Sequence, residues 1–223
     1  MFKASILKTD LMKIHEDGSQ TVFYGCDQEW FPTEWQRISG CGPTAVATII
    51  IYLSRTRDIF GMQADFGEKS KCLELMEDIW KYVTPIPGRG VNTTGMLYEG
   101  TTNYAKSKGL KIDYRFCDIP PNKKRRPKLA EVIEFIKSSL DADLPVAFLN
   151  LSNGGEENLK CWHWVTIISL EYEDNDGKAS TKILDDGIIK IIDLALWYDT
   201  TTAGGGFVYF NAMDRPPKLS RRP

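Results

Sequence analysis

The sequence has only two histidines, His15 and His163, and no Cys-x-x-Cys pair. Structural zinc sites and thioredoxin-type redox centres are built from closely spaced cysteines, with or without histidines. We therefore expect neither kind of site and no bound metal. Any chemistry that needs an imidazole base has just two candidates in this chain.

Strong charge and long hydrophobic runs are also missing. The formal net charge is -2, which gives no global field to attract nucleic acid or a membrane surface. No stretch approaches the roughly 20 apolar residues of a membrane span, and residues 1–10 do not have the pattern of a signal peptide. The one basic run, 123–126, lies between prolines and is predicted to be a solvated loop. We expect no nucleic-acid partner and no membrane span.

Five cysteines are present, an odd number with wide spacing, which is typical of free thiols in a reducing compartment. A cytoplasmic location is therefore favoured, and secretion remains open if a signal sequence has been removed. The cysteines are Cys26, Cys41, Cys72, Cys117 and Cys161.

The order of hydrophobic patterns predicts an α+β fold, with helices first and antiparallel strands after them. The length of 223 residues fits a single domain. We divide it into an N-terminal hairpin region (1–25), a mainly helical part (26–140), a mainly antiparallel sheet (141–211) and a tail (212–223). The predicted elements are a hairpin at 13–24, helices near 71–82, 93–108 and 129–140, and strands at 111–116, 145–151, 162–172, 182–185, 188–193 and 207–210.

Cys41 stands out because of its neighbours. The string Ser-Gly-Cys-Gly-Pro-Thr at 39–44 precedes an apolar run of helical length at 45–53. Pro43 suits the first turn of a helix, where its missing N–H costs nothing. Cys41 is thus predicted at the start of a nearly buried helix, where the helix dipole favours a thiolate. An arbitrary cysteine at such a place is usually structural, but this string favours a nucleophile.

His163 opens a predicted apolar strand between two tryptophans, so we predict it to be the base that serves Cys41. His15 lies in the predicted hairpin and is expected to be exposed. A catalytic imidazole needs a partner on its other nitrogen. Asp185 and Asp186, at the end of the following strand, are both candidates, and an Asp-Asp-Gly string also predicts a turn.

An oxyanion site needs hydrogen-bond donors. The backbone N–H of Cys41 is one candidate. A side-chain amide could be the other, either from Gln36, five residues before Cys41, or from Gln28, thirteen residues before it. Both glutamines lie in a stretch predicted to be irregular, and spacing alone leaves the choice open.

Taken together, these motifs resemble the papain-like cysteine peptidases, and especially the branch that processes bacteriocin leaders at double-glycine sites. The resemblance covers about residues 25–211. It rests on Gln36, the string at 40–45, the segment 140–146, His163-Trp164-Val165, Asp185-Asp186-Gly187 and the glycines at 204–206.

The resemblance implies a papain-like fold whose nucleophile helix packs on a C-terminal antiparallel sheet. It also implies Cys41 as nucleophile, His163 as base, Asp185 as the orienting acid and Gln36 as oxyanion donor. Two departures from the family matter: its glutamine usually lies six residues before the cysteine, and its acid is not doubled. We prefer Asp185 to Asp186 because the family's acid lies two or three residues before a glycine.

The predicted function is a cysteine hydrolase, a peptidase acting on a peptide or amide bond without a cofactor. One alternative is an acyltransferase or transpeptidase that uses the same acyl-enzyme. Another is a catalytically silent binding module on the same fold, with a groove lined by aromatic residues, although core packing is favoured for at least half of them. These aromatic residues are Trp30, Phe31, Trp35, Trp162 and Trp164.

Overall fold

The computed structural model describes residues 1–57, 66–173 and 177–212. The predicted turn at 174–177 and the predicted tail at 212–223 therefore lie almost entirely outside the described residues. None of the helices in the described ranges is long and apolar enough to cross a membrane.

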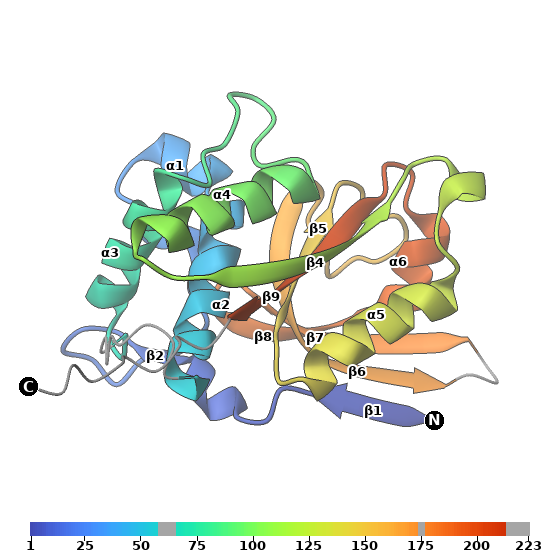
Figure 1. The fold of residues 1–223 in the computed structure, drawn as a ribbon, viewed down its shortest axis with the longest axis horizontal. Coiled ribbons are helices and arrows are strands. Elements are labelled where there is room, and N and C mark those ends of the chain that lie inside the picture. The colour runs from blue at the N-terminus through green and yellow to red at the C-terminus, as the bar shows by residue number, and fades with distance from the viewer. Residues whose placement is uncertain (58–65, 174–176, 213–223) are drawn as a thin grey trace, which may run out of the picture.

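The main element is a seven-stranded antiparallel sheet with strand order β4-β9-β5-β6-β7-β8, in which β1 also pairs with β6 (Figure 1). Its strands are β1 (Phe2–Ser5), β4 (Ile112–Ile119), β5 (Val146–Asn150), β6 (His163–Glu173), β7 (Lys178–Asp185), β8 (Ile188–Asp193) and β9 (Gly205–Ala212).

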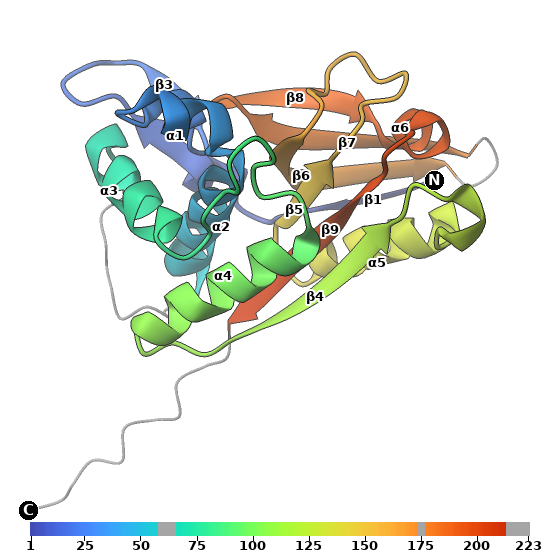
Figure 2. The ribbon, with the colours of Figure 1, turned by 90° about the horizontal axis from the view of Figure 1, so that it is seen from above.

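Helices gather at one end of the molecule and along the sheet. Figures 1 and 2 both show α1, α2 and α3 together at the end opposite the tips of β1, β6 and β7. The helices are α1 (Glu34–Ser39), α2 (Cys41–Thr56), α3 (Lys69–Trp80), α4 (Thr94–Ser107), α5 (Leu129–Asp141) and α6 (Leu194–Thr200), and a separate small sheet pairs β2 (Lys13–His15) with β3 (Val22–Tyr24).

Helix α2 is the central helix, since every residue from Cys41 to Leu53 is buried. It packs against α3 on one side and against β5 and β6 on the other. Burying one Ile or Leu side chain contributes about 1.5–3 kcal/mol, so its apolar run holds the helix firmly in place. The start of the helix, with Cys41, is thereby fixed against the sheet.

The α+β architecture agrees with the sequence prediction, and the predicted hairpin, helices and strands are present with shifted ends. Among the α-helices and strands of the described residues, three were missed. β1 pairs with β6 at the far end of the chain, α1 lies in a stretch predicted to be irregular, and α6 follows β8. β4 also belongs to the main sheet, although it falls within the part predicted to be mainly helical.

The basic run at 123–126 is only partly the solvated loop that we predicted. Arg126 is half-buried and donates hydrogen bonds to the carbonyl oxygens of Pro120, Tyr198 and Thr201. Lys123 donates to the carbonyl of Asp199 at 2.6 Å. These two residues tie the loop to the end of α6, whereas Lys124 and Arg125 are exposed.

Candidate active site

Cys41 is the first residue of α2 and is 7% exposed. The glycines beside it allow close packing around the helix start. A Cβ on Gly40 would lie 2.5 Å from the Phe31 ring, and one on Gly42 would lie 2.9 Å from the Val91 side chain. The Gly-Cys-Gly string is therefore also a packing requirement of the start of this helix.

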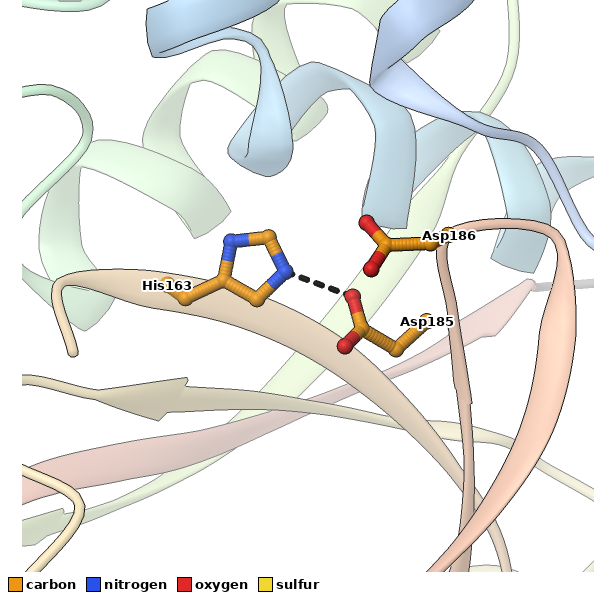
Figure 3. A group of neighbouring side chains, drawn as sticks. All are labelled: His163, Asp185 and Asp186. Carbon is orange, nitrogen blue, oxygen red and sulfur yellow. Dashed lines mark hydrogen bonds and ion pairs between the residues drawn. The ribbon is translucent and has the colours of Figure 1, made fainter. Parts of the chain in front are cut away.

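His163 and Asp185 come together at the ends of β6 and β7. Nε2 of His163 lies 2.6 Å from Oδ1 of Asp185, and both residues are buried. Figure 3 shows the imidazole aimed at Asp185, with Asp186 beside it. Cys41, His163 and Asp185 line one cavity of about 20 Å³. Because Asp185 engages Nε2, the other ring nitrogen, Nδ1, is the one left for the thiol.

The electrostatics of this group favour a charged imidazole. Burial alone lowers the pKa of His163, but hydrogen bonds and charge from Asp185 and Cys41 outweigh it and raise that pKa to about 9. Burial raises the pKa of Asp185, but His163 and Lys190 outweigh it and lower that pKa to about 2. At neutral pH the pair is therefore an imidazolium and a carboxylate.

Two lysines complete the network around the acidic pair. Lys190 Nζ lies 2.6 Å from Oδ2 of Asp185 and 3.1 Å from Oδ2 of Asp186. Lys160 Nζ lies 2.7 Å from the same oxygen of Asp186. Asp186 therefore pairs with lysines, and Asp185 is the carboxylate hydrogen-bonded to the imidazole.

Ligand atoms of His163, Asp185 and Asp186 lie within 4.8 Å of one another, close enough to consider a metal site. The ammonium groups of Lys160 and Lys190 already bond these carboxylates. A divalent cation would have to displace or face two positive charges. The donor set thus fits an ion-pair network better than a metal centre.

The two candidate glutamines have different surroundings. Gln36 belongs to the first turn of α1, where its Oε1 accepts a hydrogen bond from Thr33 Oγ1 at 2.8 Å. Gln28 lines the cavity with Cys41. Its Nε2 donates to the carbonyl of Arg37 at 2.8 Å, and its Oε1 is buried without a hydrogen-bond partner among the described residues.

A sequence signal for the position of Gln36 was available. Thr33-Glu34-Trp35-Gln36 matches the Ser/Thr-x-x-Glu/Gln pattern of a helix start. Thr33 does cap α1, accepting a hydrogen bond from the backbone N–H of Gln36. The pattern would have predicted both α1 and the engagement of Gln36 with that helix start.

A second, wider cleft of about 230 Å³ also reaches Cys41. Trp35 and Trp162 line it and are 41% and 57% exposed. Trp162 has φ +55°, a left-handed conformation that is strained for a bulky residue, directly before His163. The other candidate aromatics, Trp30, Phe31 and Trp164, are buried in the core.

Comparison with known structures supports the fold. UfSP from C. elegans superimposes over 96% of this chain with a TM-score of 0.51 and 9% sequence identity, and the match covers 35% of that chain. This chain thus corresponds to about a third of UfSP. No protein-family model matches the sequence, and none of the curated proteins matches it either.

The predicted fold class is therefore confirmed: the chain has the α+β fold of papain-like cysteine peptidases. At this level of identity the match concerns the fold alone. The narrower resemblance to the bacteriocin-leader branch stays a prediction.

Proposed function

We propose that this protein is a cysteine hydrolase that cleaves a peptide or amide bond, with Cys41 as nucleophile, His163 as base and Asp185 as the acid that orients the imidazole. The observation that carries the proposal is the meeting of these three side chains in one cavity, with Nε2 of His163 on Asp185 and the Cys41 thiol near enough to raise the pKa of the imidazole.

In the proposed mechanism, the Cys41 sulfur attacks the substrate carbonyl as a thiolate, paired with the imidazolium. His163 then donates its proton to the leaving amine, and a thioester forms. A water molecule, deprotonated by the imidazole, attacks the thioester and releases the acid. Asp185 keeps the ring in the required orientation and stabilises its positive charge throughout.

For the oxyanion we favour Gln28 over Gln36, together with the backbone N–H of Cys41. Gln28 lines the cavity that contains the thiol, whereas Gln36 does not belong to its lining and uses its Oε1 to accept a hydrogen bond from Thr33. The Gln28 Nε2 uses one hydrogen for Arg37, and its second hydrogen remains for the developing negative charge.

The substrate is expected to approach through the wider cleft, because the small cavity is too narrow for a peptide. Two exposed tryptophans and the segment Gly88-Arg89-Gly90 form its walls beside Cys41. A peptide substrate agrees with this open shape. An acyltransferase differs only in the acceptor that replaces water, so it remains the second candidate.

The first test is selective alkylation. At mildly acidic pH, iodoacetamide is expected to label Cys41 before the other four cysteines, because the imidazolium of His163 stabilises its thiolate. Peptide mapping by mass spectrometry gives the order of labelling. His163→Ala is expected to abolish the preference. Equal labelling of all cysteines, or first labelling of the exposed Cys161, would contradict the proposal.

The second test separates hydrolysis from acyl transfer. A library of internally quenched peptides is incubated with the wild type and with Cys41→Ala, and the products are identified by mass spectrometry. Cleavage by the wild type alone is expected. Adding a primary amine then divides the acyl-enzyme between acid and amide products, and mainly amide product would favour the acyltransferase. Equal cleavage by Cys41→Ala would exclude Cys41 as the nucleophile.

A further inference from the structure

Lys190 contacts the acid of the proposed triad as closely as His163 does. Its Nζ lies 2.6 Å from Oδ2 of Asp185, the oxygen that does not face His163. The Lys190 side chain is 23% exposed and that of Asp185 is 2% exposed. Each oxygen of this buried carboxylate thus has one partner of its own.

The register of the sheet explains the contact. In the β7–β8 hairpin Asp185 pairs with Ile188, and Ile183 pairs with Lys190. Because side chains alternate along a strand, Ile183 and Asp185 share a face, and so does Lys190, opposite Ile183. Lys190 is therefore the diagonal neighbour of Asp185, within reach of a long side chain.

We propose that Lys190 is a positioning residue: it holds the second oxygen of Asp185 so that the first stays aligned on Nε2 of His163. This role rests on the function proposed for the site. Lys190 acts through Asp185 and has no need to touch the substrate.

Asp185 depends on Lys190 because its carboxylate is charged and buried. Without Lys190, a buried carboxylate would keep one oxygen unpaired, which is costly, and it would face the neighbouring carboxylate of Asp186. The chain could reduce that cost by rotating Asp185 or by protonating it, and either change weakens its bond to His163. Lys160 cannot replace Lys190, since its hydrogen bond goes to Asp186.

The charged and titratable groups around the acidic pair come from several elements. Cys41 of α2 and His163 of β6 lie on one side, and Lys190 of β8 on another. Two further groups interact electrostatically with Asp186. They are Lys160, in the segment before β6, and Asp27, which directly precedes the 3-10 helix Gln28–Trp30. Of the two lysines, Lys190 is the one that bonds Asp185 directly, on the oxygen opposite the imidazolium of His163.

The test follows Cys41 alkylation by iodoacetamide as a function of pH in the full chain. Lys190→Met is expected to move the midpoint of labelling upward by about 1 pH unit, because a misplaced or protonated Asp185 no longer stabilises the imidazolium that pairs with the Cys41 thiolate. Lys190→Arg keeps charge and donors and should restore most of the wild-type profile. Lys182→Met, an exposed lysine of β7, is the matched control and should leave the midpoint unchanged.

Lys160→Met separates the effect of direct contact with Asp185 from the effect of any positive charge near the acidic pair. It removes a cation that lies nearer to Asp186 than Lys190 does, at 2.7 Å against 3.1 Å, but has no bond to Asp185, so its shift should be clearly smaller than that of Lys190→Met. Equal shifts, or an unchanged midpoint in Lys190→Met, would overturn the positioning role. If Lys190→Met does not fold, Lys190→Gln, which keeps a donor without the charge, is expected to give an intermediate shift, and no shift would overturn the proposal.

A second readout keeps this inference separate from the proposed function. Carboxyl-carbon NMR is expected to show Asp185 titrating at a higher pH in Lys190→Met than in the wild type. If wild-type Cys41 is not selectively labelled, the proposed function fails, and the NMR shift alone then decides whether Lys190 holds Asp185. An unchanged Asp185 titration would refute that contact.

Discussion

Asp185 and Asp186 are neighbours in the sequence but have different surroundings. Asp185 is the last residue of β7 and faces the imidazole of His163 at 2.6 Å. Asp186 starts the turn with φ +53° and bonds Lys160 and Lys190. At the strand end, Asp185 thus bonds the histidine and Lys190, whereas Asp186 bonds the two lysines.

This difference predicts unequal effects of two substitutions. Asp185→Ala is expected to lower turnover roughly 100- to 10,000-fold, because the imidazole loses its fixed orientation and the charge that stabilises it. Asp186→Ala should cost less than about tenfold. Both are measured on a peptide that the wild type cleaves, with circular dichroism as a control for folding. A larger loss in Asp186→Ala would assign the orienting role to Asp186.

At the scale of elements, the β7–β8 hairpin places both Asp185 and Lys190. Its two-residue loop is Asp186-Gly187, and both residues have positive φ, as a type I′ turn requires. The turn packs against β3, where the backbone N–H of Tyr24 donates to the carbonyl of Gly187 at 2.7 Å. The position of the acid therefore depends on this turn and its packing.

Gly187→Ala tests that dependence. A Cβ at Gly187 would lie 2.9 Å from the Phe23 ring, in addition to the cost of a left-handed alanine. We expect a loss of about 2–3 kcal/mol in the free energy of unfolding, with reduced selectivity of Cys41 alkylation.

Gly18→Ala is the matched control for this substitution. Gly18 has φ +67°, and a Cβ there would meet nothing within 4 Å, so only the cost of a left-handed alanine, about 1 kcal/mol, is expected. Chemical denaturation measures both variants. Equal losses would mean that the contact with Phe23 is unimportant.

At the scale of the whole molecule, the His163–Asp185 pair makes the free energy of unfolding depend on pH. The pKa of His163 rises from 6.5 to about 9 on folding, so its contribution is complete below pH 6.5 and is lost as pH rises through 9. The pKa of Asp185 falls from 3.8 to about 2, so its contribution is complete above pH 3.8 and is lost as pH falls through 2.

Urea unfolding at pH 6 and pH 9.5 tests this dependence. The wild type is expected to lose up to about 3 kcal/mol more between these two pH values than His163→Gln, at 1.36 kcal/mol for each pKa unit. The comparison with His163→Gln removes the contribution of all other titrating groups. A similar loss in both proteins would contradict the raised pKa of His163.

Some features of the protein follow from the sequence by itself because they are encoded within one short segment. The start of α2 at Cys41 depends on a local string and an apolar run. The hairpin of β2 and β3, the helices α3, α4 and α5, and most strands follow from hydrophobic periodicity and turn residues in the same way. Local chemistry also explains why Cys41 and His163 were singled out as a pair of candidates.

Other features were decided only by the tertiary structure, because they depend on contacts between distant segments. β1 is too short to be recognised alone and exists through its pairing with β6. Spacing along the chain could not separate Gln28 from Gln36, since the cavity lining depends on how the segment before α1 packs on α2, where the backbone N–H of Cys26 donates to Oγ1 of Thr48. Lys190 meets Asp185 through the register of a hairpin, and that register is fixed by which faces of β7 and β8 are buried.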